Sequence, residues 1–210
     1  MMQYDNDLVA LNSMAELDFF TSYNQIYRDA IMNDDPYYGI EVNSLFHDLS
    51  SLSVTCSKQS SSIFLSINIQ SLMSKYEQFS LELAEFKQKN IIVDAIAIQE
   101  TWDIKYPELV RIEGFDQIVF KRRRGMRGGG VGFYVRTGIK FEILENLSPF
   151  ENKVIEALSI QLTYPNNKHV VLTSIYRSNG AIPNITAAQQ MEGFMTKFSQ
   201  LLSELSATRK

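Results

Sequence analysis

The chain has few of the residues that build disulfides or metal clusters. Among its 210 residues, Cys56 is the one cysteine, and His47 and His169 are the two histidines. A single cysteine excludes an intrachain disulfide and a cysteine-rich zinc site, and so few histidines disfavour zinc hydrolase chemistry. Because nothing in this composition calls for an oxidising compartment, we expect an intracellular protein.

Long apolar runs and a basic N-terminal region are also missing. No run approaches the roughly 18 apolar residues of a membrane span. The first residues, MMQYDNDLVALNS, carry acids where a secretory signal needs bases. We therefore expect neither secretion nor a membrane partner.

The chain does contain enough apolar residues, 45% of the total, for the core of one ordinary domain. Its charge is unevenly placed, because residues 1–60 carry a net charge of −7 and residues 61–210 carry +3. The acidic part has short apolar clusters without a period and ends in a serine-rich stretch. We predict a poorly ordered leader and linker over 1–62, and one domain over 63–210.

From Ile63 onward the pattern is that of strands and helices in one layered fold. The segment 62–70 is a strand candidate, and an apolar stripe predicts a helix over 71–89. The apolar run 91–99 then predicts a strand in the middle of a sheet, because neither of its faces is polar. The apolar stripe of the helix is formed by Leu72, Tyr76, Phe79, Leu83 and Phe86.

The second half of the domain is richer in strands. Candidates lie at 116–122, 129–136, 140–144, 155–164 and 168–177, and the turn YPNNKH predicts that the last two form an antiparallel hairpin. Thr186 and Gln189 have the spacing of a capping box before a final helix, whose apolar face includes Met191 and Met195 as core residues. We expect an α/β fold with a mixed, largely antiparallel sheet covered by helices.

Two of these strands end in polar residues, Asn68 and Glu100. In a right-handed β-α-β unit both ends lie on the same edge of the sheet, where open α/β sheets place ligands. An amide and a carboxylate are hard oxygen donors of the type that Mg²⁺ accepts. The alternative is that Asn68 caps the helix that follows it and that Glu100 is a solvated strand end.

The basic segment KRRRGMRGGG, residues 121–130, allows two interpretations. A phosphate-binding Walker loop is excluded, because Val131 and Gly132 stand where lysine and a hydroxyl residue are required. Clustered arginines either contact phosphates without regard to sequence or keep a hairpin turn soluble. For Trp102, packing under a loop is favoured over stacking on a base. For His169, a surface or cross-strand position is favoured over catalysis.

Four segments together carry a family resemblance: SINIQSL, DAIAIQETW, GGGVGFYVR and VVLTSIYR, in that order. They resemble the endonuclease/exonuclease/phosphatase family in its apurinic-endonuclease-like branch, and most closely the endonuclease domain of non-LTR retrotransposons of the LINE or jockey type. The resemblance runs from about Ile63 to the C-terminus. It implies a four-layer α/β sandwich that hydrolyses DNA phosphodiesters with Mg²⁺, or with Mn²⁺ as an alternative.

The resemblance also implies roles for single residues. Glu100 matches the metal-binding glutamate, Asn68 the asparagine that helps to hold the metal-bound phosphate, and Tyr176 the tyrosine that faces the scissile phosphate. Contacts to the DNA backbone are expected from arginines of the basic segment and from the residue after the tyrosine. These arginines are Arg122, Arg123, Arg124, Arg127 and Arg177.

Two later elements of the family, Gly-Asp-x-Asn and Ser-Asp-His, do not occur in this chain. We therefore expect an N-terminal part of the sandwich that is inactive alone, with an unfinished sheet that favours self-association. Two other functions stay open: a non-catalytic nucleic-acid-binding remnant, and a phosphoesterase of the same family that acts on a small phosphoester. If the substrate is DNA, the protein is expected in the nucleus.

Overall fold

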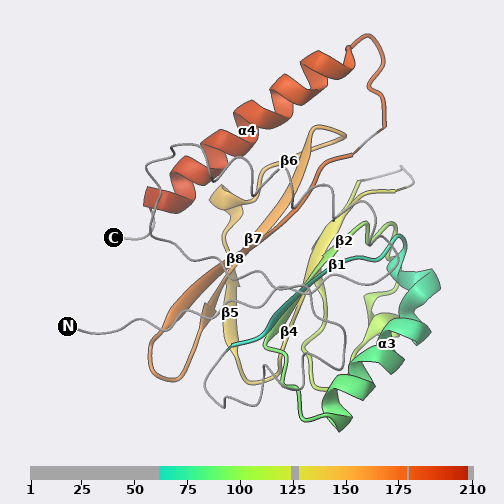
Figure 1. Ribbon diagram of the computed structural model, residues 1–210, viewed down its shortest axis with the longest axis vertical. Helices are drawn as coiled ribbons and strands as arrows, with labels where there is room; N and C mark the ends of the chain where they lie inside the picture. The colour runs from blue at the N-terminus through green and yellow to red at the C-terminus, as the bar shows by residue number, and fades with distance from the viewer. Residues whose placement is uncertain (1–61, 124–127, 179, 208–210) are drawn as a thin grey trace, which may run out of the picture.

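The computed structural model describes residues 62–123, 128–178 and 180–207 of the chain. The predicted leader, apart from its last residue, and the arginines at 124 and 127 lie outside these residues. Within them, two helices and two sheets form an α/β fold, as the sequence predicted (Figure 1). The helices α3 (Leu72–Gln88) and α4 (Ala187–Ala207) lie on opposite sides of the strands.

The first sheet contains four strands in the order β1-β2-β4-β3. These are β1 (Phe64–Asn68), β2 (Ala95–Gln99), β4 (Val131–Val135) and β3 (Val119–Lys121). β1 and β2 are parallel and α3 connects them, whereas the other pairs are antiparallel. The predicted central strand is therefore central, although it begins at Ala95 rather than at Ile91. The residues before it form a connection in which Ile91 and Val93 are buried.

The second sheet is antiparallel and is built around its longest strand, β7 (Ile155–Thr163). β8 (His169–Tyr176) pairs with β7 along nearly its whole length, which confirms the predicted hairpin. β5 (Lys140–Ile143) and β6 (Phe150–Glu151) pair with the two ends of β7. Two short 3-10 helices, η2 (Pro107–Val110) and η3 (Glu145–Leu147), complete the connections.

Strand alternation divides the apolar side chains into separate clusters. On one face of the first sheet, Ile96 and Ile98 cluster with Phe79 of α3. On its other face, Phe133 belongs to a cluster that includes the buried residues Leu158 and Leu162 of β7. A third and smaller cluster joins β7 and η3 to α4.

The apolar face of the first sheet is not open to water, so the sequence-based expectation of an unfinished sheet is wrong on this point. β7 and β8 cover that face, and their cluster with the first sheet includes Phe64, Val131 and Ile160. The expectation failed because strands 140–176 were assigned to the same sheet as the earlier ones. The predicted self-association loses the support of an open apolar face, whereas its other ground, an unpaired strand edge, stays because β8 pairs with β7 alone among the described strands.

The final helix α4 begins as predicted, because Thr186 and Gln189 exchange hydrogen bonds as a capping box does. Its core face is narrower than predicted. Leu201 is buried, but Met191 and Met195 are 43% and 49% exposed, so their assignment to the core is wrong. The helix therefore packs on the second sheet through a narrow strip, and the flanking apolar residues stay outside it. None of the helices described is long and apolar enough to cross a membrane.

Candidate functional site

Asn68 and Glu100 lie together, where the parallel strands β1 and β2 end. The Asn68 side-chain amide Nδ2 donates a hydrogen bond to Glu100 Oε1 at 3.0 Å. Asn68 does not cap α3, because the N-cap position is Ser71 and no side chain caps it. Of the two sequence-based alternatives, the geometry therefore favours the paired amide and carboxylate.

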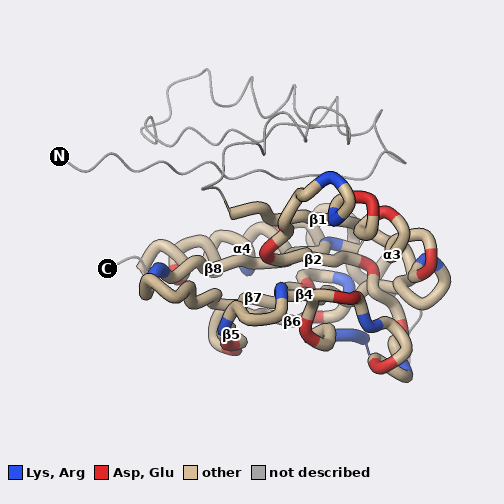
Figure 2. The backbone as a smooth tube through the Cα atoms, turned by 90° about the horizontal axis from the view of Figure 1, so that it is seen from below, with Lys and Arg blue, Asp and Glu red and all other residues tan. Residues whose placement is uncertain are grey.

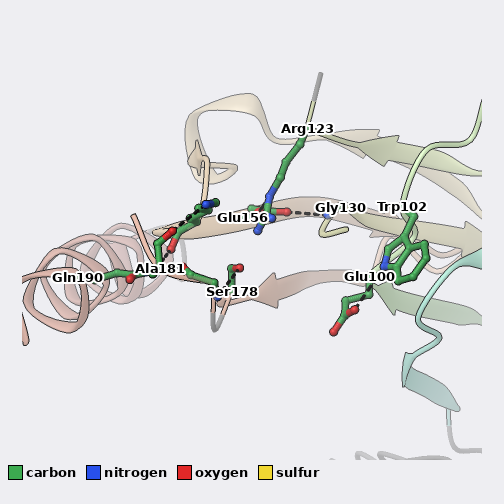
Figure 3. Close-up of polar contacts among 10 residues, drawn as sticks. Glu100, Trp102, Arg123, Gly130, Glu156, Ser178, Ala181 and Gln190 are labelled. Carbon is green, nitrogen blue, oxygen red and sulfur yellow. Dashed lines mark hydrogen bonds and ion pairs between the residues drawn. The ribbon is translucent and has the colours of Figure 1, made fainter. Parts of the chain in front are cut away.

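Trp102 contacts the same carboxylate from two positions further along the chain (Figure 3). Its indole Nε1 donates to Glu100 Oε2 at 3.3 Å, and the residue is half-buried. The side chain thus packs at the loop, as expected, and in addition it fixes the second carboxylate oxygen. Both oxygens of Glu100 are held by different donors.

Tyr176, the last residue of β8, reaches Glu100 from the second sheet. Burial raises the pKa of Tyr176 to about 12, and the negative charge of Glu100, to which its hydroxyl is hydrogen-bonded, also favours the protonated form. The phenol therefore remains a neutral hydrogen-bond donor at physiological pH. All three sequence-predicted residues of the metal and phosphate site, Asn68, Glu100 and Tyr176, meet at one end of the two sheets.

Backbone hydrogen bonds fix the segment that carries Glu100. Ser71 N donates to Glu100 O at 2.8 Å, and Leu72 N donates to Thr101 O at 3.2 Å. On the other side, Trp102 N donates to Gly129 O at 2.9 Å. The segment after β2 is therefore held between the start of α3 and the glycine-rich end of the basic segment.

Below the site, Gln99 bridges the two sheets. Its side-chain Nε2 donates to Ser174 Oγ of β8 at 2.9 Å and lies 3.3 Å from Ser66 Oγ of β1. These polar residues were not predicted as part of a site, because they stand inside segments with the pattern of ordinary strands. The signal for them was a glutamine and serines inside otherwise apolar strands, a place where a polar group needs a partner.

Three of the arginines predicted to contact DNA lie in the described part of the chain, and each has a different partner. Arg122 pairs with Asp103 and also donates to the carbonyl of Ile104. Arg177 lies over the ring of Phe194 in α4, 5.8 Å from its centroid. Arg124 and Arg127 fall outside the residues that the structure describes.

Arg123 is buried and pairs with Glu156 of β7, a residue that the sequence analysis did not single out (Figure 3). The predicted DNA contact requires an exposed guanidinium, which this arrangement does not provide. Glu156 is the one charged residue in β7, and β8 contains no Asp, Glu, Lys or Arg. Figure 2 shows the contrast with the heavily charged region around α3. A lone acid in an apolar strand was the signal for this pair.

Glu100 is the one carboxylate among the residues that meet here, and its neighbours act as hydrogen-bond donors to it. A carboxylate has about four acceptor positions, and Asn68, Trp102 and Tyr176 occupy three of them. Mg²⁺ commonly takes one or two carboxylates and fills its other positions with water and substrate phosphate. Among the residues described, no group of three or more His, Cys, Asp or Glu is close enough together to hold a metal ion.

A histidine for proton transfer is not found at this site in the described part of the chain. His169 begins β8, at the end of the strand opposite Tyr176, where it is exposed and lies 3.1 Å from Thr163 Oγ1 across the hairpin. This is the cross-strand position that the sequence favoured. The described residues at this site therefore supply one carboxylate and the hydrogen-bond donors that surround it. Comparison with known proteins adds no relative, since no family model and no curated protein matches the chain.

Proposed function

We propose that Glu100 and its neighbours form the metal and phosphate site of a phosphodiesterase of the endonuclease/exonuclease/phosphatase kind, acting on DNA. The observation that carries this proposal is the convergence on one carboxylate of donors from both sheets. Asn68 comes from the first sheet and Tyr176 from the second, and they hydrogen-bond the same Glu100 side chain. The family resemblance of the four sequence segments points to the same residues.

Each residue has a task in this proposal. When bound to Glu100, the metal ion neutralises charge on the phosphate and on the leaving oxygen. Tyr176 stays protonated, and its single O–H, which is hydrogen-bonded to Glu100, would turn to a phosphoryl oxygen when the metal ion takes its place on the carboxylate. Asn68 orients Glu100 with one amide N–H and offers the other to the phosphate. Trp102 keeps the second carboxylate oxygen in place, so that little reorganisation is needed when the ligand enters.

We also propose that the domain is a four-layer α/β sandwich, in the order α3, first sheet, second sheet, α4. Three apolar clusters support this order. The first lies between α3 and the first sheet, the second between the two sheets, and the third between the second sheet and α4.

Catalysis by the described residues alone is expected to be slow or absent. Glu100 is engaged as the metal ligand, Tyr176 holds its proton, and Glu156 is buried in an ion pair. None of these groups is free to take a proton from an attacking water molecule, which is the step that a general base contributes to hydrolysis. Binding of metal and phosphodiester is therefore the more direct test.

The test uses Trp102 as a reporter, because it is the one tryptophan in the chain. Titration with Mn²⁺, which quenches nearby fluorophores, is expected to quench the tryptophan emission in a saturable way, and Mg²⁺ is expected to reverse the quenching. Glu100→Gln should abolish the saturable phase because the charged ligand is lost. Glu142→Gln, on exposed β5, is the control and should titrate like the wild type. Saturable quenching that survives in Glu100→Gln would refute the metal site.

A nicking assay on supercoiled plasmid with Mg²⁺ then separates catalysis from binding. Slow nicking by the wild type that disappears in Glu100→Gln supports the phosphodiesterase. DNA binding that is indifferent to Glu100→Gln and to Mg²⁺, and that weakens steeply with salt, points instead to a non-catalytic nucleic-acid-binding protein.

A further inference from the structure

The buried ion pair between Arg123 and Glu156 has no task in the proposed chemistry. Arg123 follows β3 and its side chain is 5% exposed, while the Glu156 side chain in β7 is 1% exposed. Arg123 Nε hydrogen-bonds to Glu156 Oε1, and Gly130 N donates to Glu156 Oε2 at 2.6 Å. Burying two charges costs much of what their attraction returns, so such a pair is weak evidence for added stability. The groups that contact the pair, the glycine-rich segment on one side and Tyr176 on the other, indicate a different role for it.

One side of the pair holds the glycine-rich segment against the loop that carries Glu100. Gly130 O accepts a hydrogen bond from Thr101 N at 3.3 Å, and Gly129 O accepts one from Trp102 N. The fit is close, since a Cβ on Gly129 would stand 2.6 Å from Arg123 Nε and a Cβ on Gly130 would collide with Thr101 Oγ1. The glycines are thus packed between the ion pair and the loop at Thr101 and Trp102.

The other side of the pair lies beside Tyr176. Glu156 and Tyr176 are direct cross-strand partners in the β7–β8 hairpin. Tyr176 in turn hydrogen-bonds to Glu100 from the second sheet. Two separate chains of contacts therefore connect Glu156 with Glu100. One passes through Gly130 and the loop after β2, and the other passes through Tyr176 of β8.

We propose that Arg123 and Glu156 are positioning residues, which fix the glycine-rich segment so that Trp102 and Tyr176 hold the Glu100 carboxylate in the geometry for its ligand. The basic segment then contributes to the site from inside the molecule, through a buried arginine. The effect of Arg123 and Glu156 on metal binding rests on the proposed function, but their effect on the position of Trp102 does not.

The main test is the double variant Arg123→Met with Glu156→Leu, which removes both charges and keeps apolar bulk in the same space. Such replacements of buried ion pairs are usually tolerated by the fold. Without the carboxylate, Gly130 N loses its acceptor and the segment is no longer held against Thr101 and Trp102. We expect greater quenching of Trp102 by acrylamide, a red shift of its emission, and Mn²⁺ affinity reduced by about 10-fold.

The matched control is Arg136→Met, which breaks the Arg136–Asp94 ion pair at the opposite end of β2. It should leave Trp102 emission and acrylamide quenching as in the wild type. Circular dichroism and thermal melts establish that each variant is folded. If the double variant does not fold, Glu156→Gln replaces it: it keeps an acceptor for Gly130 N but removes the charge that holds Arg123, so Trp102 should change in the same direction by a smaller amount.

Three outcomes would overturn the positioning role. The first is a folded double variant in which Trp102 emission and quenching are unchanged. The second is an equal change in Arg136→Met, which would mean that Trp102 reports general loosening. The third is a Trp102 change without loss of Mn²⁺ affinity, in a wild type that does bind Mn²⁺. If the wild type binds no Mn²⁺, the proposed function fails, and the Trp102 measurements alone decide the positioning role.

Discussion

Single residues around Glu100 adopt backbone conformations that most side chains avoid. Glu100 and Trp102 have φ values of 54° and 58°, and at the start of α3 Gln70 and Ser71 have 48° and 85°. Residues in this left-handed region cost of order 1–3 kcal/mol each unless they are glycine. The strain falls in the two segments that meet at the site, where a backbone hydrogen bond from Ser71 to Glu100 holds it in place.

Ser71→Gly is accordingly expected to stabilise the protein. Glycine adopts a φ of 85° without a Cβ clash, and the gain, reduced by the greater freedom of glycine in the unfolded chain, should be about 1 kcal/mol. Urea denaturation followed by circular dichroism measures it. Ser74→Gly, in the first turn of α3, is the opposite case. It should lose about 1 kcal/mol because glycine is a poor helix former and because the hydrogen bond from Ser74 Oγ to Ser71 O is lost. A loss of stability in both variants would contradict the strain at Ser71.

At the scale of elements, α4 has two buried anchors, an apolar one on the second sheet and η3 and a polar one on the connections beside the sheet. Leu201 is 1% exposed and packs in the cluster with Leu147 and Ala157, whereas the next residue, Leu202, is 47% exposed. At the helix N-terminus, the buried Gln190 side chain donates to Lys153 O at 2.6 Å and to Gly180 O at 3.1 Å. These two buried anchors lie about three turns apart on α4, and the contacts of Phe194 with Arg177 and of Lys197 with Glu151 lie between them.

Two adjacent leucines test this attachment. Leu201→Ala should cost about 2–5 kcal/mol, because it removes a buried side chain and leaves a cavity. Leu202→Ala should change the free energy of unfolding by less than about 1 kcal/mol, because that side chain is already half in water. Chemical denaturation of the two variants provides the comparison. Similar losses in both would mean that α4 packs through a different face.

Periodicity predicted most of these elements, because each depends on a local repeat. The stripe on α3, the β7–β8 hairpin and the capping box of α4 all follow from residues close together in the sequence. The sequence does not show which of the apolar residues on a helix will contact the neighbouring sheet. Met191 and Met195 have the right spacing for a core face, but the contact strip of α4 passes beside them.

In the candidate site, too, some residues follow from a local pattern in the sequence and others depend on how the two sheets pack. Asn68 and Glu100 were predicted together because parallel strands that flank one helix end on the same edge of a sheet. The pairing of Arg123 with Glu156, residues 33 positions apart, depends on how the second sheet packs over the first, and no local pattern encodes that. Arg123, which stands in a basic run, was therefore predicted to be a surface residue.

For the whole molecule, buried tyrosines couple stability to alkaline pH. Burial raises the pKa of Tyr164 and of Tyr176 to about 12 and also raises the pKa of Tyr134. An unfolded tyrosine has a pKa of about 10, so the folded state binds these protons more tightly. Their contribution to stability is therefore complete below about pH 10 and is lost as the pH rises toward about 12.

Urea midpoints measured between about pH 8 and about pH 11 should be level at first and then fall steeply above about pH 10. Tyr164→Phe removes one of the ionisable groups, so its decline should be shallower, although the variant also loses the hydrogen bond to Asp94. A midpoint that stays constant to about pH 11 would show that these phenols ionise as easily in the folded protein as in water.

The position of Glu100 and Tyr176 on different sheets has a consequence for how the site comes into being. Each sheet can form its own hydrogen bonds without the other, but the two side chains meet only when the sheets are aligned along their strands. A slip of one residue, about 3.3 Å, would separate them. The hydrogen bond between this carboxylate and this phenol is therefore a measure of sheet alignment, and the ligand proposed for Glu100 would favour the aligned molecules.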